Sequence, residues 1–396
     1  MYGPRAAQVS SVLGELPALG WRPTIVCLAP RRGGPHWPSG IDAEPLTGVD
    51  YVRVPSPQEW LAVRAARRFV PALRDRPDPA RVWIRRATRA AIAAARARAA
   101  GVLITFAQPW SDHLVGLRVQ RATGLPWVAH FSDPWVASPY ATPKQRAIWR
   151  PMEAQVIERA TALVFVTRET ADATLAPYPA EWRKKVAIVP HGFDPRRMPP
   201  PPPRDPARAR LRLVYTGRFY AGVRTPMPLL RAIARDRVLA DALDVVFVGP
   251  QVDAYRADAA ALGLASTMTF AGRVSAADAA AIAATADALL VIDAPSAAPS
   301  LFLPSKLVEY LPFRKPIVGI TPVDGASAAL LARLGCPVAS PDDEDAMVTL
   351  LRRLVDRWRN GGLTVGSEFD RVAAEFDIRC TARQLSDVLV SASAAH

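Results

Sequence analysis

The sequence predicts an α/β protein with two doubly wound parallel sheets. Short apolar runs rich in β-branched residues recur along its 396 residues, and helical stretches separate them. Strands buried on both faces of a parallel sheet need such continuous apolar runs, because helices cover both sides. The alternation is broken by a proline-rich run, MPPPPPRDP at residues 198–206, and then restarts. We therefore expect two doubly wound domains joined by a stiff linker.

Each expected strand is a short apolar run between helical or turn-forming stretches. The strands expected before the linker are residues 24–28, 51–54, 102–105, 127–130, 163–166 and 187–189. The helices expected among them are residues 7–19, 86–99, 111–123 and 147–159. The strands expected after the linker are residues 212–215, 245–248, 268–270, 288–292 and 317–320. The resulting organisation is an N-terminal domain at 1–197, a linker at 198–206, a second domain at 207–378 and a C-terminal segment at 379–396.

The N-terminal domain departs from this pattern at its start. A doubly wound domain usually opens with a strand and a glycine-rich turn, but here the chain passes from Met1 almost directly into its first helix. We expect the first strand of this domain to be missing, either because the true start lies upstream or because the chain has lost it. Ligands bind such sheets beyond the carboxyl ends of the strands, and two facing domains form a cleft there.

Composition narrows the class of protein. Half of the residues are hydrophobic, which excludes a disordered chain. The apolar runs are far shorter than the roughly 20 residues of a membrane-spanning helix, and the N-terminus has no signal-peptide pattern. Cys27, Cys336 and Cys380 are too far apart for a zinc motif, a CxxC pair or a disulfide framework, and we interpret them as small buried apolar residues. We expect a cytoplasmic protein.

The charge is unevenly placed. The first 200 residues hold 28 basic and 15 acidic residues, whereas the remainder holds 22 and 21. Residues 51–100 alone contain 12 arginines and 3 acids. Such asymmetry indicates an anionic partner, either a membrane surface or a nucleic acid. A coding bias offers an alternative, since the chain has 45 arginines and 5 lysines, but that bias explains the choice of arginine and not its placement.

The strongest candidate constellation is PSKLVEYLPFRKPIVG at residues 304–319. Pro304 or Ser305 can open a helix, and Lys306 and Glu309 then lie on one face because they are three residues apart. A helix N-terminus with a lysine attracts phosphate, and a glutamate one turn later can accept hydrogen bonds from ribose hydroxyls. The alternative is an ordinary surface ion pair on a helix.

Two further segments follow strands of the second domain. The strand near 212–215 ends at Gly217, which lets a ligand approach the backbone, and Arg218 and Arg224 follow. Two guanidinium groups at that place suit a diphosphate, although loop arginines are common in so arginine-rich a chain. FAGRV, at residues 270–274, also follows a strand and could offer backbone groups to a nucleobase edge.

In the first half, GLPWVAHFSDPW places His130, Ser132 and Asp133 just past a strand. His130 and Asp133 are candidate catalytic residues, but a lone histidine is often a satisfied core residue and Asp133 could cap the next segment. His113 is a weaker candidate, at the start of the helix expected at 111–123. No Walker loop, HExxH motif or Ser/His/Asp order is visible, and the lack of GxGxxG argues against a dehydrogenase.

Six motifs together resemble a known family. They occur in the order GLPWVAHFSDPW, ERATALVFVTRETAD, VPHGFDP, LVYTGRFY, FAGRV and PSKLVEYLPFRKPIVG. This set, spread over residues 3–390, resembles the retaining glycosyltransferases of family 4, which have the GT-B architecture, and most closely the bacterial members that build surface polysaccharides. The resemblance implies two Rossmann-like domains facing across a cleft, a nucleotide-diphosphate sugar as donor, and a lipid-linked or saccharide acceptor.

The resemblance also implies roles for single residues. The diphosphate contacts would be Gly217, Arg218, Arg224, Ser305 and Lys306. Glu309 would hold the ribose and Arg273 with Val274 the base, while His130 and Asp133 would lie across the cleft near the transferred sugar. The final helix, residues 381–390, would cross back onto the N-terminal domain. No cofactor and no metal ion are expected, because the cationic residues can take over charge stabilisation.

Two departures from the family pattern stand out. The family often has two glutamates separated by seven residues, and Leu301 occupies the first position here, so one usual sugar contact is missing. The missing first strand would also remove a glycine-rich loop on the acceptor side. Competing interpretations are a nucleotide-sugar epimerase of the same architecture and an inactive homologue that binds an anionic surface. We expect contact of residues 64–98 with an anionic membrane rather than with nucleic acid, because few aromatic residues lie between these arginines.

Overall fold

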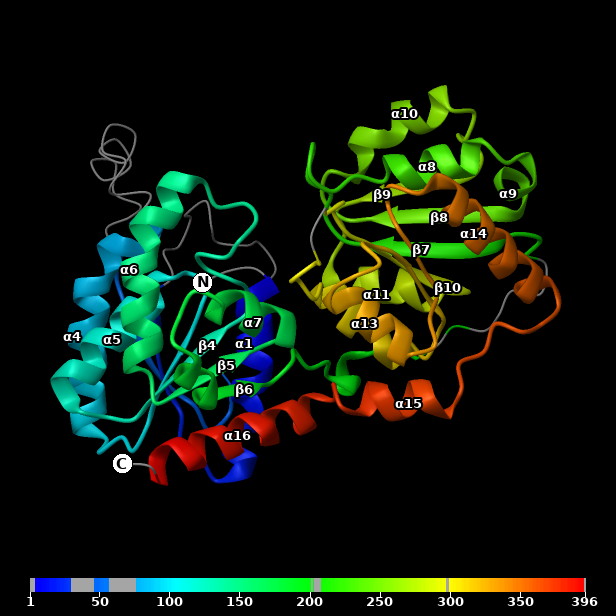
Figure 1. Ribbon diagram of the computed structural model, residues 1–396. Helices are drawn as coiled ribbons and strands as arrows, with labels where there is room; N and C mark the ends of the chain where they lie inside the picture. The colour runs from blue at the N-terminus through cyan, green and yellow to red at the C-terminus, as the bar shows by residue number, and fades with distance from the viewer. Residues whose placement is uncertain are drawn as a thin grey trace. The chain divides into compact units, whose positions relative to one another are not determined.

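The computed structural model describes residues 4–29, 46–56, 76–200, 202, 208–296 and 299–394. The chain divides into two compact units (Figure 1). Unit 1 is Met1–Gly192 together with Ile378–His396, and unit 2 is Phe193–Asp377. The first division therefore lies a few residues before the expected linker at 198–206, part of which falls outside the described residues. The second division falls beside the expected boundary at 378/379.

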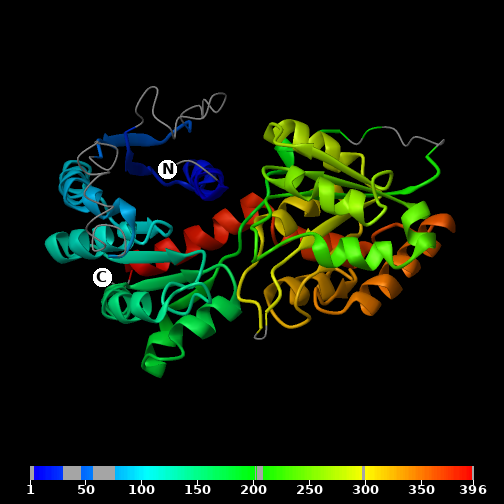
Figure 2. The ribbon, with the colours of Figure 1, turned by 90° about the horizontal axis from the view of Figure 1, so that it is seen from above.

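Unit 1 contains two parallel ladders, which Figure 2 shows in blue and in cyan to green. The first consists of β1 (Thr24–Leu28) and β2 (Asp50–Val54). The second has the order β3 (Leu103–Phe106), β4 (Trp127–Phe131), β5 (Ala162–Phe165), β6 (Val186–Ile188). Among the described residues β1 and β3 do not pair, so the six strands form no continuous sheet. That the domain lacks its first strand stays a prediction.

The helices of unit 1 are α1 (Pro4–Glu15), α4 (Ile84–Ala97), α5 (Ser111–Thr123), α6 (Pro143–Arg159), α7 (Arg168–Leu175) and α16 (Ile378–Ala394). Some of these helices have clear local start or stop signals, but α4 begins and ends two residues before its expected bounds of 86–99, and α6 begins four residues before its expected start at 147. Thr142 and Gln145 form a reciprocal capping box at the start of α6, which satisfies two otherwise unpaired backbone donors. α5 ends at Gly124, whose φ of 73° favours glycine. The first helix, expected at 7–19, begins three residues earlier and ends at Glu15.

The last helix belongs to unit 1 although it follows all of unit 2 in the sequence. α16 lies beside α1 and packs on β4 (Figure 1). Leu385 and Leu389 of α16 share a core cluster with Leu13, Leu16 and Val128. Burial of these apolar side chains, at roughly 1.5–3 kcal/mol each, holds the C-terminal segment in place.

Unit 2 is one parallel sheet of six strands. In sheet order they are β12 (Val338–Ala339), β11 (Ile317–Ile320), β10 (Ala288–Ile292), β7 (Leu211–Thr216), β8 (Leu243–Val248) and β9 (Met268–Gly272). The strands expected from the sequence are all present, and β10 and β11 have the expected bounds. β12 was not expected, because two residues are too short to give a pattern.

Helices cover both faces of this sheet. They are α8 (Met227–Ala234), α9 (Arg237–Ala242), α10 (Arg256–Ala261), α11 (Ala276–Ala284), α12 (Ser305–Tyr310), α13 (Ala326–Arg333), α14 (Glu344–Arg359) and α15 (Ser367–Ala374). Because successive side chains of a strand point to opposite faces, Leu213 packs in the cluster that includes α8, α9 and α14, while Val214 packs in the cluster that includes α12, α13 and α15. This arrangement confirms the predicted doubly wound architecture.

The remaining short elements are 3-10 turns. Their bounds are Pro17–Leu19, Pro79–Trp83, Ala180–Lys185, Pro195–Arg197, Val252–Tyr255 and Leu311–Phe313. Within the part of the chain that the structure describes, no helix has both the length and the apolar character needed to cross a bilayer.

Candidate functional site

Three glycines lie side by side at the carboxyl edge of the unit 2 sheet. Gly217 follows β7, Gly249 follows β8 and Gly272 ends β9. The Gly217 N–H donates to the Val248 carbonyl at 2.8 Å, and the Gly249 N–H donates to the Gly272 carbonyl at 2.7 Å. A Cβ atom on Gly249 would lie 2.0 Å from the Gly217 oxygen, and the φ of Gly249 is +139°. This glycine ledge therefore exists only because the three residues have no side chains.

The loop after β7 brings the two predicted arginines together. Tyr220 and Arg224 exchange backbone hydrogen bonds of 2.8 and 2.9 Å, which closes the loop on itself. The Arg224 guanidinium donates to the Arg218 carbonyl at 2.8 Å and lies over the Tyr220 ring. Its Nε is buried and has no hydrogen-bond partner in the described part of the chain. Arg218 itself is exposed, so one of the two guanidinium groups faces solvent.

The short helix α12 is tied directly to the end of β7. The Thr216 N–H donates to the Tyr310 hydroxyl at 2.7 Å, and the Thr216 hydroxyl lies 3.1 Å from the same oxygen. Tyr310 is fully buried, and this burial raises its pKa well above the usual range. These hydrogen bonds tie α12 to the residue that precedes Gly217; on the same helix Glu309 is next to Tyr310, and Lys306 lies one turn before it.

Lys306 and Glu309 form an ion pair with an N–O distance of 2.5 Å. Both side chains are more than a third exposed. This is the surface pair that the sequence allowed as the alternative interpretation, and it accounts for the two residues without any ligand. Such exposed pairs contribute about 1 kcal/mol or less, so a ligand that offers better partners can displace this one. Ser305 is the first residue of α12, with Pro304 at its N-cap.

Arg273 and Val274 follow the far end of the glycine ledge. They come directly after Gly272, whose φ of +68° turns the chain out of β9. Arg273 is exposed, whereas Val274 packs partly against the core. The structure thus places all the predicted donor-binding residues of unit 2 on loops at the carboxyl edge of one sheet or on α12.

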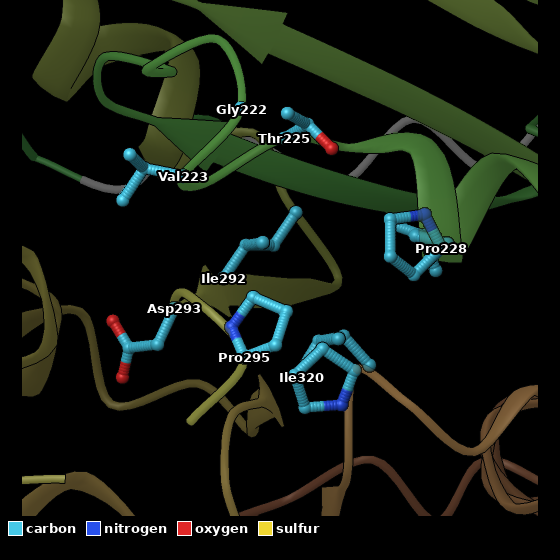
Figure 3. Close-up of a pocket in the computed structure, with 10 residues that line it drawn as sticks. Gly222, Val223, Thr225, Pro228, Ile292, Asp293, Pro295 and Ile320 are labelled. Atoms are coloured by element: carbon cyan, nitrogen blue, oxygen red, sulfur yellow. The ribbon is translucent and has the colours of Figure 1, made fainter. Parts of the chain in front are cut away.

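A pocket of about 220 Å³ lies at the same edge on the other side of β7 (Figure 3). Asp293, which comes directly after β10, lies at one side of it and is 7% exposed. Burial raises the pKa of Asp293, while hydrogen bonds from Ser327 and Thr321 and the charge of Arg224 oppose that rise. Sequence reasoning missed Asp293, because a single aspartate after an apolar strand carries no motif.

In unit 1, His130 is paired with an arginine far away in the sequence. His130 is the next-to-last residue of β4, inside the strand rather than past it as expected, and is 5% exposed. The Arg5 guanidinium donates to His130 Nδ1 at 3.1 Å and to the Ala107 carbonyl at 2.7 Å. Burial lowers the pKa of Arg5 to about 10. Burial, and then the Arg5 charge, hold the pKa of His130 well below its usual range.

Arg5 and His130 line a small pocket between α1, α16 and the carboxyl ends of β3, β4 and β6. Its volume is about 20 Å³, enough for one ordered water. His191 lines it too, and its pKa falls to about 3 because it is buried near Arg5. Gly192 follows, and a Cβ atom there would lie 2.5 Å from the Thr381 hydroxyl of α16. Arg5 and His191 are additional residues that the sequence did not single out.

Asp133 lies beyond the end of β4, where the sequence places it. Its carboxylate accepts hydrogen bonds from the Ser132 hydroxyl at 3.3 Å and from the Gln108 amide at 3.4 Å. Burial raises the pKa of Asp133, and the Arg5 charge opposes this. Asp133 does not cap a helix, because α6 begins only at Pro143.

His113 is a core residue and not an open site. It is fully buried, its Nδ1 lies 2.8 Å from the Thr105 hydroxyl, and its ring lies 4.5 Å from that of Phe131. Burial lowers its pKa to about 3. Its neighbour Asp112 is different, since burial and the charge of Asp78 raise its pKa well above the usual range. Among the described residues no three histidines, cysteines or carboxylates gather as a metal site would need.

The fold is that of the GT-B glycosyltransferases, as the two units with their parallel strands and the similar solved structures show. The protein family described as "Glycosyl transferase 4-like domain" matches residues 6–192, which is nearly all of the first segment of unit 1. No curated protein matches the sequence.

Several solved structures are similar to this chain. Sucrose-phosphate synthase from Thermosynechococcus elongatus is 15% identical, with a TM-score of 0.72 over 100% of this chain and 94% of that one. Anabaena HepE in complex with UDP and glucose is 13% identical, with a TM-score of 0.66 over 98% and 96%. WaaG, a glycosyltransferase involved in lipopolysaccharide biosynthesis, is 14% identical, with a TM-score of 0.61 over 98% and 96%. At these identities the likeness is one of fold.

Proposed function

We propose that this chain is a retaining glycosyltransferase that moves a sugar from a nucleotide-diphosphate donor to a hydroxyl of a lipid-linked or saccharide acceptor. The observation that carries the proposal is the carboxyl edge of the unit 2 sheet. There the glycine ledge, the arginine loop after β7 and the Lys306–Glu309 pair lie together, since Tyr310 ties α12 to Thr216. The family match in unit 1 and the fold support the same class of enzyme.

The donor is proposed to lie along this edge. Arg218, Arg224 and Lys306 bind the diphosphate, Ser305 offers its backbone N–H group, and Gly217 lets the phosphates approach the backbone because it has no side chain. Arg224 already has one unsatisfied buried N–H, and a phosphate oxygen satisfies it. Glu309 accepts the ribose hydroxyls once Lys306 turns to phosphate. Arg273 and Val274 meet the base. Similar solved structures contain UDP or UDP-glucose, which supports a nucleotide-sugar donor.

The reaction needs a leaving diphosphate to be stabilised. The bond from the anomeric carbon to the phosphate oxygen breaks, the bond to the acceptor oxygen forms on the same face, and the acceptor proton goes to the departing phosphate. The guanidinium groups and Lys306 balance the negative charge that develops, which is preorganised electrostatic stabilisation. In unit 1, His130 and Asp133 are proposed to orient the acceptor side. The alternatives are a nucleotide-sugar epimerase and an inactive homologue that binds an anionic surface.

A membrane contact is a further part of the proposal. The outer face of α4 exposes four arginines, and its inner face buries Ile84 and three alanines. The exposed residues are Arg85, Arg86, Arg89 and Arg96. Each basic residue near an anionic leaflet contributes about 1 kcal/mol, so this face can hold the chain near a lipid-linked acceptor. The rest of the predicted stretch, residues 64–75, lies outside the described residues.

A thermal-shift screen with UDP, GDP, ADP, CMP and their sugar conjugates tests the donor proposal. A ligand at about 100 times its dissociation constant stabilises the folded state by about 2.7 kcal/mol. We expect one diphosphate series to raise the melting temperature by several degrees and product analysis with an acceptor to show transfer with retained configuration. A cooperatively melting protein that responds to none of these nucleotides would contradict it. Conversion of the donor without an acceptor would favour the epimerase.

Liposome co-sedimentation tests the membrane contact. We expect the chain to bind vesicles of phosphatidylglycerol and phosphatidylcholine at low salt and to be released as salt screens the charges. A variant with Arg85, Arg89 and Arg96 changed to glutamine should bind less. Equal binding of this variant and the parent would place the contact elsewhere.

A further inference from the structure

The pocket beside Asp293 is not explained by the donor residues predicted from the sequence, because none of them lines it. Its lining is mostly apolar and comes from the loop after β7, the start of α8, and the ends of β10 and β11 (Figure 3). The residues that line it include Val223, Thr225, Pro228, Asp293, Pro295 and Ile320. An apolar cavity of about 150 Å³ holds a benzene ring, so a pocket of about 220 Å³ is large enough for one six-membered sugar ring.

Asp293 is held firmly by one of its two oxygens. Its Oδ2 accepts hydrogen bonds from the Thr321 hydroxyl at 2.9 Å and from the Ser327 hydroxyl at 2.8 Å. Its backbone N–H donates to the Ile320 carbonyl at 2.9 Å. Both hydroxyl donors use Oδ2, and among the described residues no hydrogen bond reaches Oδ1. The carboxyl group is thus preorganised and keeps one acceptor atom for a ligand.

The position of the pocket follows from strand order. β8 and β9 lie on one side of β7, and β10 and β11 lie on the other. The proposed base contacts, Arg273 and Val274, follow β9, and the proposed diphosphate loop follows β7. In a sugar nucleotide the sugar and the nucleoside are attached to opposite ends of the diphosphate. A donor that runs along this edge therefore places its sugar on the β10–β11 side.

The pocket shares a wall with the diphosphate loop. Gly222, Val223 and Thr225 line the pocket and flank Arg224 in the same loop. Asp293 lines the same pocket as these residues, which places it close to the loop that would hold the phosphates. A group joined to the second phosphate can reach the pocket without a long spacer.

We propose that this pocket receives the transferred monosaccharide and that a sugar hydroxyl donates a hydrogen bond to Oδ1 of Asp293. The inference rests on the proposed function. Pro228 and Pro295 meet the apolar C–H face of the ring, while Asp293 supplies the carboxylate contact that Leu301 cannot. Asp293 contributes a negative charge to a mostly apolar pocket. Neutral sugars therefore bind better there than sugars that carry a carboxylate of their own, because two like charges repel each other.

Calorimetric titration of the full chain tests this assignment. The probes are UDP, GDP and ADP, each with its glucose conjugate, and UDP-glucuronate. We expect one glucose conjugate to bind about tenfold or more tightly than its own diphosphate, as a hydrogen bond to a charged group allows. Asp293→Asn and Asp293→Ala should remove this advantage and leave the affinity for the bare diphosphate unchanged. If the base is uracil, Asp293→Asn should also weaken the discrimination against glucuronate.

The controls separate the possible failures. Asp258→Asn changes an exposed aspartate of α10 and should leave both affinities unchanged. Melting curves show whether each variant is folded, and the nearly isosteric asparagine variant remains informative if the alanine variant unfolds. Binding of no diphosphate would overturn the proposed function, and this inference with it. Diphosphate binding combined with an Asp293 variant that keeps the sugar advantage, or loses both affinities equally, would overturn the sugar pocket alone.

Discussion

Arg5 donates a hydrogen bond to Nδ1 of His130 over 3.1 Å, although 125 residues separate them in the sequence. A guanidinium group has no acceptor, so Nδ1 must be the unprotonated ring nitrogen. The neutral ring therefore carries its proton on Nε2. His130 can then donate a hydrogen bond from Nε2 but cannot act as a general base there. In the proposed function, His130 would therefore orient the acceptor as a hydrogen-bond donor.

The ring state of His130 can be measured directly by ¹⁵N NMR. We expect the neutral Nε2–H form from pH 8 down to pH 5, because burial and then the Arg5 charge both oppose protonation. Arg5→Ala removes a positive charge, so the pKa of His130 should rise, and Arg5→Lys should keep it low. His113, whose pKa is about 3, is the internal reference. A wild-type ring protonated on Nδ1 would contradict the assignment.

Glu153 should make the stability of the protein depend on pH. It is fully buried, accepts hydrogen bonds from the Val136 N–H at 2.9 Å and the Tyr178 hydroxyl at 2.7 Å, and has a pKa raised to about 7 by burial. Between pH 4.5 and 7 the folded state therefore binds more protons than the unfolded state. The free energy of unfolding should fall by about 3 kcal/mol as pH rises through this range.

Urea unfolding of the wild type and Glu153→Gln at several pH values tests this. Glutamine keeps an acceptor for Val136 and cannot ionise, so the variant should lose this part of the pH dependence and be the more stable protein at pH 8. Equal pH profiles for the two proteins would show that Glu153 does not titrate in this range.

Lys306→Ala and Glu309→Ala should separate donor use from stability. Each removes one partner of an exposed ion pair, which changes stability by about 1 kcal/mol or less. Turnover should nevertheless fall by about 100-fold or more, because each variant loses a charge that we propose to stabilise the leaving group or to position the ribose. The measurement is kcat/KM with the identified donor, together with a melting curve.

Arg371→Ala provides the matched control for that pair. Arg371 and Glu368 form an ion pair with the same i,i+3 spacing on α15, and both are about 60% exposed. This variant should leave turnover unchanged. Wild-type turnover in both Lys306→Ala and Glu309→Ala would remove α12 from the donor site.

Gly249→Ala should be strongly destabilising. Its Cβ atom would lie 2.0 Å from the Gly217 oxygen, so the glycine ledge would have to open. Gly263 is the control, since its φ of +74° strains any side chain but nothing lies within 4 Å of a Cβ atom there. We expect Gly263→Ala to cost about 1–2 kcal/mol of unfolding free energy and Gly249→Ala clearly more. Similar losses of unfolding free energy for the two variants would mean that the glycine ledge can accommodate a Cβ atom at residue 249 with little strain.

Much of the fold could be predicted from local pattern. The bounds of β10, β11 and α5 are those expected from apolar runs, from a helix opened at Ser111 and from a glycine stop. The edge strand β12 could not be predicted, because two residues are too short to show an alternating apolar pattern. In the candidate site, the residues that belong to contiguous motifs could be named from the sequence. They are Gly217, Arg218 and Arg224, which follow a strand, and Lys306 and Glu309, which are three residues apart on one helix.

By itself, then, the sequence determined which segments become strands and helices and which loops carry cationic and carboxylate groups, because periodicity, capping and turn chemistry act over a few residues. Only the tertiary structure decided which distant groups meet. Arg5 reaches His130, and Asp293 receives the hydroxyls of Thr321 and Ser327. Those pairings depend on how strands are ordered and faces are buried, and burial is also what shifts the pKa values of His130, Asp293 and Glu153.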